Sequence, residues 1–188
     1  RVEPWKATVT LEMASGLKYR LDTLSAVIRN NRENVNFNNL NGVLKIQEQD
    51  VDTGKQVAEQ DYNTITVPYG GTYSIELCDG TKVYLNSGTV LEFPSRFNKS
   101  RREVKLKGEA YFDVTKSKEW PFIVRTCRSS VKVLGTSFNV CSYEEDALEQ
   151  VTLEQGGVEV KHHDETYLLH PGEQFELDTT NEEVEVKP

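Results

Sequence analysis

The chain has 188 residues and carries 30 acidic against 22 basic side chains, for a formal net charge of −8 at pH 7. With 37% hydrophobic and 28% charged residues, it is long enough to bury a core as one domain or two small ones. No run approaches the roughly 18 apolar residues that a membrane helix needs, and the negative charge argues against a nucleic-acid partner, because phosphate contacts require clustered Lys and Arg.

The chain opens with Arg-Val-Glu-Pro-Trp, without an initiator methionine or a signal peptide, and we interpret it as a fragment of a longer protein. The first predicted element is a hairpin at Leu11–Asp22, because two strand-like runs flank the turn residues Ser15 and Gly16. The same pattern returns at Ile75–Asn86 around Asp79 and Gly80. The sequence therefore predicts a duplicated hairpin.

Between these two hairpins the signals are weaker. The segment Leu24–Ile28 has helical spacing, the Asn-rich text Asn30–Asn41 is typical of a loop, and Gly42–Gln47 is typical of a strand. The polar segment Asp50–Asn63 is the best candidate for a linker. We therefore expect residues 1–63 to form an N-terminal β-rich segment with a long loop, and residues 64–188 to form the main β domain.

From Thr64 onward, short strand-like runs alternate with Gly-containing turns at a regular spacing. The predicted strands are Thr64–Val67, Tyr73–Leu77, Lys82–Asn86, Val90–Phe93, Glu103–Lys107, Glu109–Val114, Phe122–Cys127, Val131–Leu134, Ser137–Ser142, Gln150–Glu154, Val158–His162, Thr166–Leu169, Gln174–Leu177 and Glu183–Lys187. Many short strands with almost no helix predict an all-β fold, with antiparallel strands in a sandwich or solenoid-like stack.

The run Val104–Val114 has the clearest strand pattern in the chain. Its odd and even positions separate into a polar face, which includes Glu109 and Asp113, and an apolar face, which includes Phe112. Since successive side chains of a strand point to opposite faces, this run predicts a half-buried strand. Gly108 lies in its middle, where glycine permits a bulge, a bend or a close backbone approach.

Charge is unevenly distributed along the chain. Basic residues are concentrated from Arg96 to Lys107, interrupted only by Glu103, whereas the chain is overwhelmingly acidic from Glu144 to its end. These stretches are typical of solvated strand faces and loops, and the alternative is a surface that steers a charged protein partner.

The three cysteines show no metal-ligand spacing. Cys127 and Cys141 could form a disulfide between neighbouring strands in an oxidising compartment, and the alternative is that Cys78, Cys127 and Cys141 are buried free thiols.

Groups that could support catalysis or metal binding do not form a recognisable pattern. His162 and His163 are adjacent, so on a strand they point to opposite faces and cannot easily bind one ion, which leaves His163 with Glu165 as the remaining pair. Glu109 and Asp113 share a face but lie roughly 13 Å apart along it, farther than the carboxylate pair of a glycosidase. We therefore predict no catalytic, metal-binding or cofactor-binding residues and no enzymatic activity.

A set of motifs in fixed order resembles the FecR-type periplasmic domain of anti-sigma factors, especially those of Bacteroidetes. The matching text runs from V-P-Y-G-G-T-Y-S-I-E-L-C-D-G at Val67 through R-E-V-K-L-K-G-E-A-Y-F-D-V at Arg102, P-F-I-V-R-T at Pro121, V-K-V-L-G-T-S-F-N-V at Val131 and V-T-L-E-Q-G-G-V-E-V at Val151 to L-H-P-G-E-Q at Leu169. On this resemblance, residues 64–188 are the FecR-type β domain. The motif residues, which we expect to be mainly structural, are Gly71, Asp79, Gly80, Leu85, Asn86, Pro94, Gly108, Glu109, Phe112, Pro121, Phe122, Gly135, Thr136, Phe138, Asn139, Gly156, Pro171 and Gly172.

The resemblance implies a periplasmic domain of a single-pass, membrane-anchored regulator, with no cofactor, no nucleic acid and no membrane contact of its own. In this family the signalling domain of a TonB-dependent outer-membrane receptor contacts the regulator, which then releases an extracytoplasmic-function sigma factor. The sigma factor is reached only through a cytoplasmic segment that this fragment lacks.

On physical grounds, such a domain could dock a partner strand through exposed edge strands, with charge complementarity for orientation. The alternative function is a carbohydrate-binding or carbohydrate-processing β domain, which would use exposed tyrosines such as Tyr69, Tyr73, Tyr84 and Tyr111.

Overall fold

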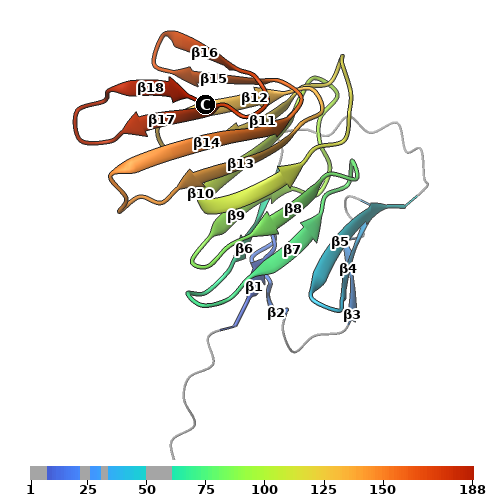
Figure 1. The fold of residues 1–188 in the computed structure, drawn as a ribbon. Helices are drawn as coiled ribbons and strands as arrows, with labels where there is room; N and C mark the ends of the chain where they lie inside the picture. The colour runs from blue at the N-terminus through green and yellow to red at the C-terminus, as the bar shows by residue number, and fades with distance from the viewer. Residues whose placement is uncertain (1–7, 22–25, 31–33, 50–60) are drawn as a thin grey trace, which may run out of the picture.

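The computed structural model describes residues 8–21, 26–30, 34–49 and 61–188, and these contain strands and turns but no helix (Figure 1). The predicted all-β fold is therefore confirmed. The strands are β1 (Thr10–Glu12), β2 (Lys18–Arg20), β3 (Ala26–Asn30), β4 (Val35–Leu40), β5 (Val43–Glu48), β6 (Tyr62–Thr66), β7 (Tyr73–Glu76), β8 (Lys82–Leu85), β9 (Val90–Pro94), β10 (Arg102–Asp113), β11 (Phe122–Arg125), β12 (Ser130–Val133), β13 (Ser137–Ser142), β14 (Leu148–Gln155), β15 (Val158–His162), β16 (Glu165–Leu169), β17 (Gln174–Asp178) and β18 (Val184–Lys187).

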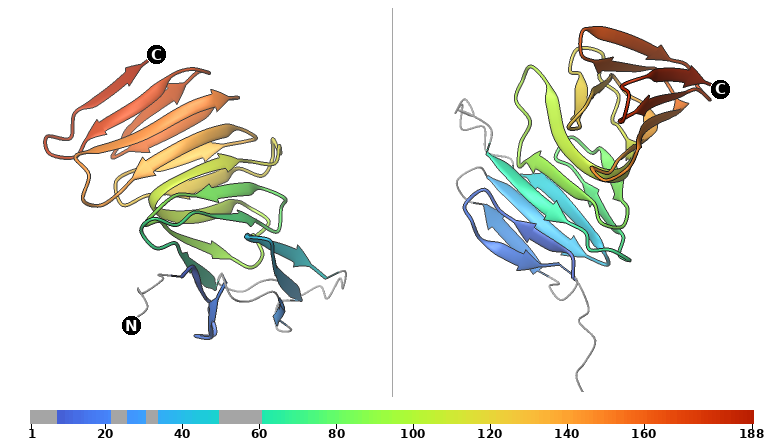
Figure 2. Two further views of the ribbon diagram at one scale, coloured as in Figure 1. Left: turned by 60° about the horizontal axis from the view of Figure 1, so that its bottom comes forward. Right: turned by 90° about the vertical axis from the view of Figure 1, so that its left-hand side faces the viewer.

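These strands pair into two sheets that face each other. Sheet A has the order β2-β1-β6-β9-β10-β11-β12-β15-β16. Sheet B has the order β3-β4-β5-β7-β8-β10-β13-β14-β17-β18. The strands stack along the long axis of the molecule, with the N-terminal strands and β15–β18 at opposite ends (Figures 1 and 2). Most neighbours are antiparallel as predicted, but β10–β11 and β5–β7 are parallel.

Strand β10 joins the two sheets because it belongs to both. Its first half pairs with β9 and β11 in sheet A, and its second half pairs with β8 and β13 in sheet B. The change occurs at Gly108, whose φ of 108° lies in the region that favours glycine. The two strands predicted at Glu103–Lys107 and Glu109–Val114 are thus one strand, bent at the glycine that the sequence identified.

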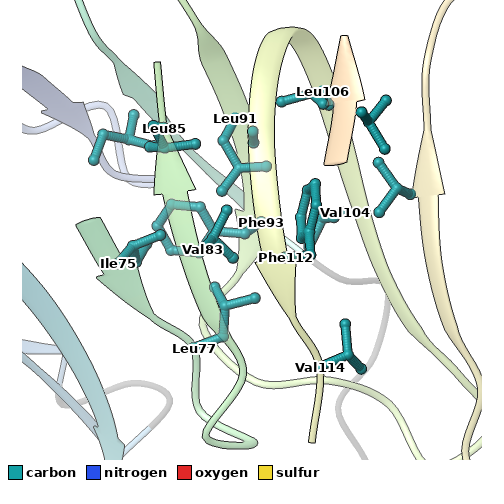
Figure 3. Close-up of a cluster of buried hydrophobic side chains, with 14 of the residues drawn as sticks. Ile75, Leu77, Val83, Leu85, Leu91, Phe93, Val104, Leu106, Phe112 and Val114 are labelled. Carbon is teal, nitrogen blue, oxygen red and sulfur yellow. The ribbon is translucent and has the colours of Figure 1, made fainter. Parts of the chain in front are cut away.

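The hydrophobic core fills the space between the sheets. The inward positions of β10 alternate as predicted, with Val104, Leu106, Ala110 and Phe112 all buried. Side chains from β7 and β8 of sheet B and from β9 of sheet A point into the same interior (Figure 3). Burial of a large aliphatic or aromatic side chain contributes about 1.5–3 kcal/mol, so this two-sided core is the main stabilising element.

The duplicated hairpin is present in both predicted places. β1 pairs with β2 and β7 pairs with β8, both antiparallel. The two turns share the same backbone hydrogen bond: the Gly16 amide donates to the Met13 carbonyl over 2.8 Å, and the Gly80 amide donates to the Leu77 carbonyl over 2.9 Å. The two copies nevertheless lie in different sheets, β1–β2 in sheet A and β7–β8 in sheet B.

Two sequence interpretations are wrong in the N-terminal part. Residues 26–28 of the segment with helical spacing lie in strand β3, and residues 24 and 25 are outside the described residues. The Asn-rich text predicted as a loop contains strand β4, whose side chains Val35, Phe37 and Asn39 are buried. Of the predicted linker, residues 50–60 lie outside the described residues, and β6 begins at Tyr62.

The boundary that we predicted near residue 63 crosses paired strands. Leu11 of β1 is opposite Ile65 of β6, and Leu44 of β5 is opposite Ile75 of β7, with all four side chains buried. Removing residues 1–60 should therefore expose Ile65 and Ile75 and lower the free energy of unfolding by about 2 kcal/mol or more. Urea denaturation of the full chain and of residues 61–188 measures this difference. Equal stability of the two would instead support an independent domain from residue 64.

Candidate functional site

The outer face of sheet B carries a continuous row of polar and aromatic side chains. Directly opposed residues cross β7, β8, β10, β13, β14 and β17, in the order Ser74, Tyr84, Tyr111, Asn139, Thr152 and Gln174. Hydrogen bonds hold parts of this row, since Thr152 Oγ1 donates to Gln174 Oε1 over 2.9 Å and the Tyr111 hydroxyl donates to Glu154. This face is therefore an ordered polar surface.

Three motif residues converge at one point of this face. Glu109 follows the Gly108 bend on β10, Asn86 follows the end of β8, and Asn139 lies on β13. Asn86 Nδ2 donates to Glu109 Oε2 and Asn139 Nδ2 donates to Glu109 Oε1, each over 2.9 Å. The Glu109 carboxylate is thereby fixed by one neutral donor on each oxygen.

A hollow of about 290 Å³ adjoins this carboxylate. Tyr84 and Tyr111 line it beside Glu109, and their ring centroids lie 6.0 Å apart at an angle of 50°. The hydrogen bond to Glu154 raises the pKa of the Tyr111 hydroxyl above its usual value, so that ring stays neutral. The arrangement offers a fixed anion beside a pair of aromatic rings, which is suited to binding.

The sequence had marked these residues singly. Asn86 and Asn139 were named only as motif residues, and Glu109 was compared with Asp113. Asp113 does not join the cluster, and its carboxylate accepts a hydrogen bond from Ser137 Oγ over 3.2 Å. Asn86, Glu109 and Asn139 meet because of the register in which their strands pair. The spacing of residues along the chain does not determine this register. The sequence held one indication of this site: all three residues lie at predicted strand ends or on polar strand faces.

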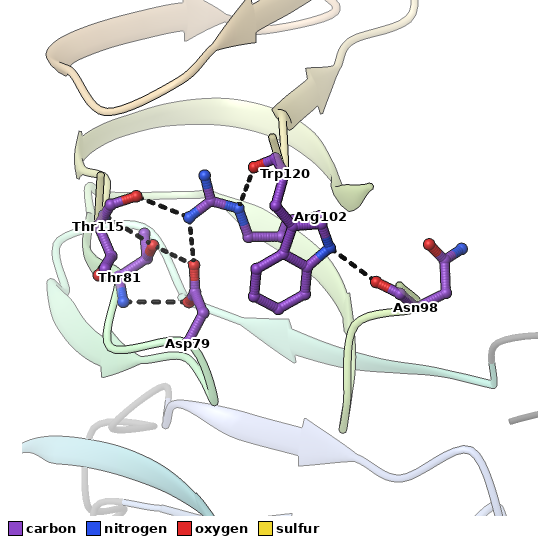
Figure 4. Close-up of polar contacts among 6 residues, drawn as sticks. All are labelled: Asp79, Thr81, Asn98, Arg102, Thr115 and Trp120. Carbon is purple, nitrogen blue, oxygen red and sulfur yellow. Dashed lines mark hydrogen bonds and ion pairs between the residues drawn. The ribbon is translucent and has the colours of Figure 1, made fainter. Parts of the chain in front are cut away.

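A second polar cluster is buried and surrounds Arg102 (Figure 4). Its guanidinium is fully buried, donates Nη1 to Asp79 Oδ2 over 2.9 Å and to the Thr115 carbonyl over 2.7 Å, and donates Nε to the Trp120 carbonyl over 2.9 Å. Asp79 also accepts hydrogen bonds from the Thr81 amide and hydroxyl within the β7–β8 turn. The cluster ties the β7–β8 turn to the start of β10 and is structural.

This placement corrects the interpretation of the basic stretch. Arg102 is buried, and three other cations of the stretch are engaged within the chain, as is Arg125 of β11. Arg101 and Arg125 pair with the buried Glu103, Lys107 pairs with Glu144, and Lys105 lies over the Tyr62 ring. A larger hollow of about 430 Å³ at β9–β11 is lined by three of these cations, Lys105, Lys107 and Arg125. The positive charge that the alternative, a steering surface, would need is therefore largely neutralised within the chain.

The histidines do not form a metal cluster, and the described residues contain no group of three or more His, Cys, Asp or Glu side chains placed to hold an ion. The expectation that His162 and His163 point to opposite faces is wrong, because His163 has a φ of 51° in the turn and the two rings lie 4.1 Å apart. His162 is buried with Nδ1 2.9 Å from the Arg128 carbonyl oxygen, and His163 Nε2 lies 3.5 Å from Glu182 Oε2.

All three cysteines are free thiols in this structure. Burial raises the pKa of Cys78 to about 12 and that of Cys141 to about 11, which keeps both protonated at neutral pH. Cys127 is exposed in the β11–β12 turn, so the expectation of a buried thiol is wrong at this position.

The other motif residues occupy turns and the core. Phe112 stacks on Phe138 with centroids 5.2 Å apart, and a Cβ at Gly135 would lie 2.6 Å from the Lys116 Cα. The turn or strand-end positions are Gly71, Gly80, Pro94, Pro121, Gly135, Thr136, Gly156, Pro171 and Gly172, and the core positions are Leu85, Phe112, Phe122 and Phe138.

The chain is thus an all-β domain in which two sheets share one packed interior, and the outer face of sheet B carries an ordered polar surface. The FecR protein family matches residues 63–159, and the chain belongs to this family. The resemblance to the FecR family that the motifs indicated is therefore confirmed.

Two crystal structures from Parabacteroides distasonis are similar to about two thirds of this chain. Both are of a protein described as a "putative anti-sigma factor". The first is 43% identical with a TM-score of 0.66 and the second is 44% identical with a TM-score of 0.65, over 67% and 66% of this chain. The chain spans 59% and 58% of the length of those two chains. No curated protein matches the chain.

Within the described residues there is no helix with the length and apolar character needed to cross a membrane.

Proposed function

We propose that this chain is the periplasmic regulatory domain of a membrane-anchored anti-sigma factor. In this role it relays the state of a TonB-dependent outer-membrane receptor to an extracytoplasmic-function sigma factor, by docking and without chemistry of its own. The observation that carries the proposal is the FecR family match over residues 63–159, supported by the 43% identity to a protein described as an anti-sigma factor. The sigma factor would bind a cytoplasmic segment of the whole protein, and the receptor's signalling domain would contact this domain.

The sheet edges offer one physical route for docking. Among the described strands, β2 and β16 end sheet A and β3 and β18 end sheet B, so each has a paired neighbour on one side only. At the C-terminal end, Leu168 of β16 is 66% exposed. A partner strand added to such an edge gains main-chain hydrogen bonds, and an exposed apolar side chain adds buried area.

Calorimetry of the intact periplasmic region against the signalling domain of its receptor tests the proposal. We expect saturable binding with one site, and no binding to the signalling domain of an unrelated receptor. The absence of heat and of pull-down at both low and physiological salt would contradict the proposal, because screening then cannot explain the result.

Carbohydrate binding is the second candidate, and the hollow lined by Tyr84 and Tyr111 is the observation that favours it. The exposed ring of Tyr84 and the half-buried ring of Tyr111 can stack on a sugar, and the neighbouring amide groups can hydrogen-bond it. The volume of about 290 Å³ is nevertheless at the lower limit of pockets that enclose a ligand, which are roughly 300–1,000 Å³. The hollow is therefore better matched to one side chain than to an oligosaccharide.

A further inference from the structure

The Glu109 carboxylate is an ordered anion without a counter-ion. In the part of the chain that the structure describes, its hydrogen-bond partners are the amides of Asn86 and Asn139, and its oxygens form no ion pair. A carboxylate oxygen accepts about two hydrogen bonds, so each oxygen retains one free site. The two free sites lie on one rigid group, as bidentate recognition by a guanidinium requires.

The walls of the hollow favour the same kind of ligand. Tyr84 and Tyr111 present aromatic rings beside the carboxylate, and Tyr84 is 48% exposed. A planar guanidinium can stack on such rings while it donates to a carboxylate, whereas a lysine ammonium lacks both the plane and the fork. The geometry thus selects arginine over lysine.

Charges around the hollow are predominantly negative. Asp113 lies on the same face of β10, and Glu154 is tied to Tyr111. The nearest cation on the adjoining strand is Lys82, whose register partner is Asp113. A cationic group is therefore attracted to the hollow, and an anionic partner such as nucleic acid is repelled.

We infer that the hollow formed by Tyr84, Asn86, Glu109, Tyr111 and Asn139 receives an arginine side chain of a docked protein partner. The inference rests on the proposed docking function and adds the chemical identity of one anchor. We call this hollow the arginine socket. Arginine is enriched among the residues that dominate binding energy at interfaces, which is consistent with a single preformed binding site on an otherwise polar face.

The test uses the full chain labelled with ¹⁵N and the peptide acetyl-Gly-Arg-Gly-amide as the probe. We expect this peptide to shift the side-chain NH₂ resonances of Asn86 and Asn139, because these groups share the carboxylate with the ligand. The matched citrulline peptide, which is neutral and nearly isosteric, should cause no comparable shift. Equal shifts from the arginine and citrulline peptides, or shifts of these amides by cellotetraose but not by the arginine peptide, would overturn the assignment.

Three variants separate the socket from general effects of charge. Glu109→Gln should weaken peptide binding about tenfold, since it replaces charge-assisted hydrogen bonds by neutral ones. Tyr84→Ala, at an exposed position, should weaken it severalfold and serves as the informative variant if Glu109→Gln does not fold. Glu159→Gln on β15 of sheet A makes the same change of charge elsewhere and should leave binding unchanged. Unaltered peptide binding in both Glu109→Gln and Tyr84→Ala would refute the socket.

Failure of this inference is distinguishable from failure of the proposed function. If the arginine peptide binds but the receptor's signalling domain does not bind the intact periplasmic region, the docking function fails and the socket remains. If the signalling domain binds equally well to the wild type and to Glu109→Gln, and the peptide shifts are absent, docking stands and the arginine assignment is wrong.

Discussion

Replacing Asp79 by alanine should lower the free energy of unfolding by about 3–5 kcal/mol, the usual effect of removing one partner of a buried ion pair. The Arg102 guanidinium is fully buried, and Asp79 supplies its counter-charge at 2.9 Å. The other partners are the neutral carbonyls of Thr115 and Trp120, and Nη2 has no hydrogen-bond partner. Without Asp79, the cation would stay buried and uncompensated.

Urea denaturation followed by circular dichroism measures this loss, with Asp113→Ala as the matched control on an exposed carboxylate. Asp113→Ala should cost less than about 0.5 kcal/mol, as is usual for surface substitutions. The double variant Asp79→Ala/Arg102→Met should be more stable than the sum of the single effects predicts, because it removes both charges together. A loss below about 1 kcal/mol for Asp79→Ala, or strict additivity, would show that the pair does not stabilise the fold.

Much of the fold could be predicted from local patterns. In β10 the alternation of Leu106, Ala110 and Phe112 with polar residues identified the buried face, because a strand has a period of two wherever one face packs on a core. Glycine at position 108 was correctly linked to a bend or close approach. Such features depend on neighbours in sequence, and for that reason a single sequence reveals them.

The wrong prediction of a loop at Asn30–Asn41 also has a cause in the local sequence. Asparagine is uncommon in strands, so the Asn-rich text around β4 was interpreted as a loop. The alternation of Val35 and Phe37 was nevertheless present, and Asn41-Gly42 is a two-residue hairpin turn with φ values of 53° and 76°. Weighting the period and the Asn-Gly pair above composition would have predicted the β4–β5 hairpin.

The candidate site could not be predicted in this way. Asn86, Glu109 and Asn139 meet because β8, β10 and β13 are neighbours in a particular register, and pairing partners distant in sequence leave no mark on the spacing. The burial of Arg102 could not be predicted from the local sequence either. It lies within a basic stretch, and only the interior formed by other strands makes it a buried cation.

Replacing Gly108 by alanine should destabilise the protein by about 3 kcal/mol or more. A Cβ at this position would lie 2.8 Å from the Thr89 Cα and 2.6 Å from its Oγ1, and φ is 108°, where side chains other than glycine are strained. Thr89 has little freedom to move, because it is buried and its hydroxyl both accepts from the Glu109 amide and donates to the Glu109 carbonyl, each over 3.0 Å. The bend that carries β10 from sheet A to sheet B would have to open.

This variant also tests the link between the fold and the candidate site. Glu109 directly follows the bend, so a shift at Gly108 should displace its carboxylate from Asn86 and Asn139 and change the side-chain amide resonances of both. Gly157→Ala is the matched control, because a Cβ there meets no atom within 4 Å and its φ is not in the left-handed region. The control should change neither the urea midpoint nor these resonances. If Gly108→Ala unfolds at the same urea concentration as the wild type, the bend does not require glycine, and the sheets must be joined by a corner that tolerates a side chain.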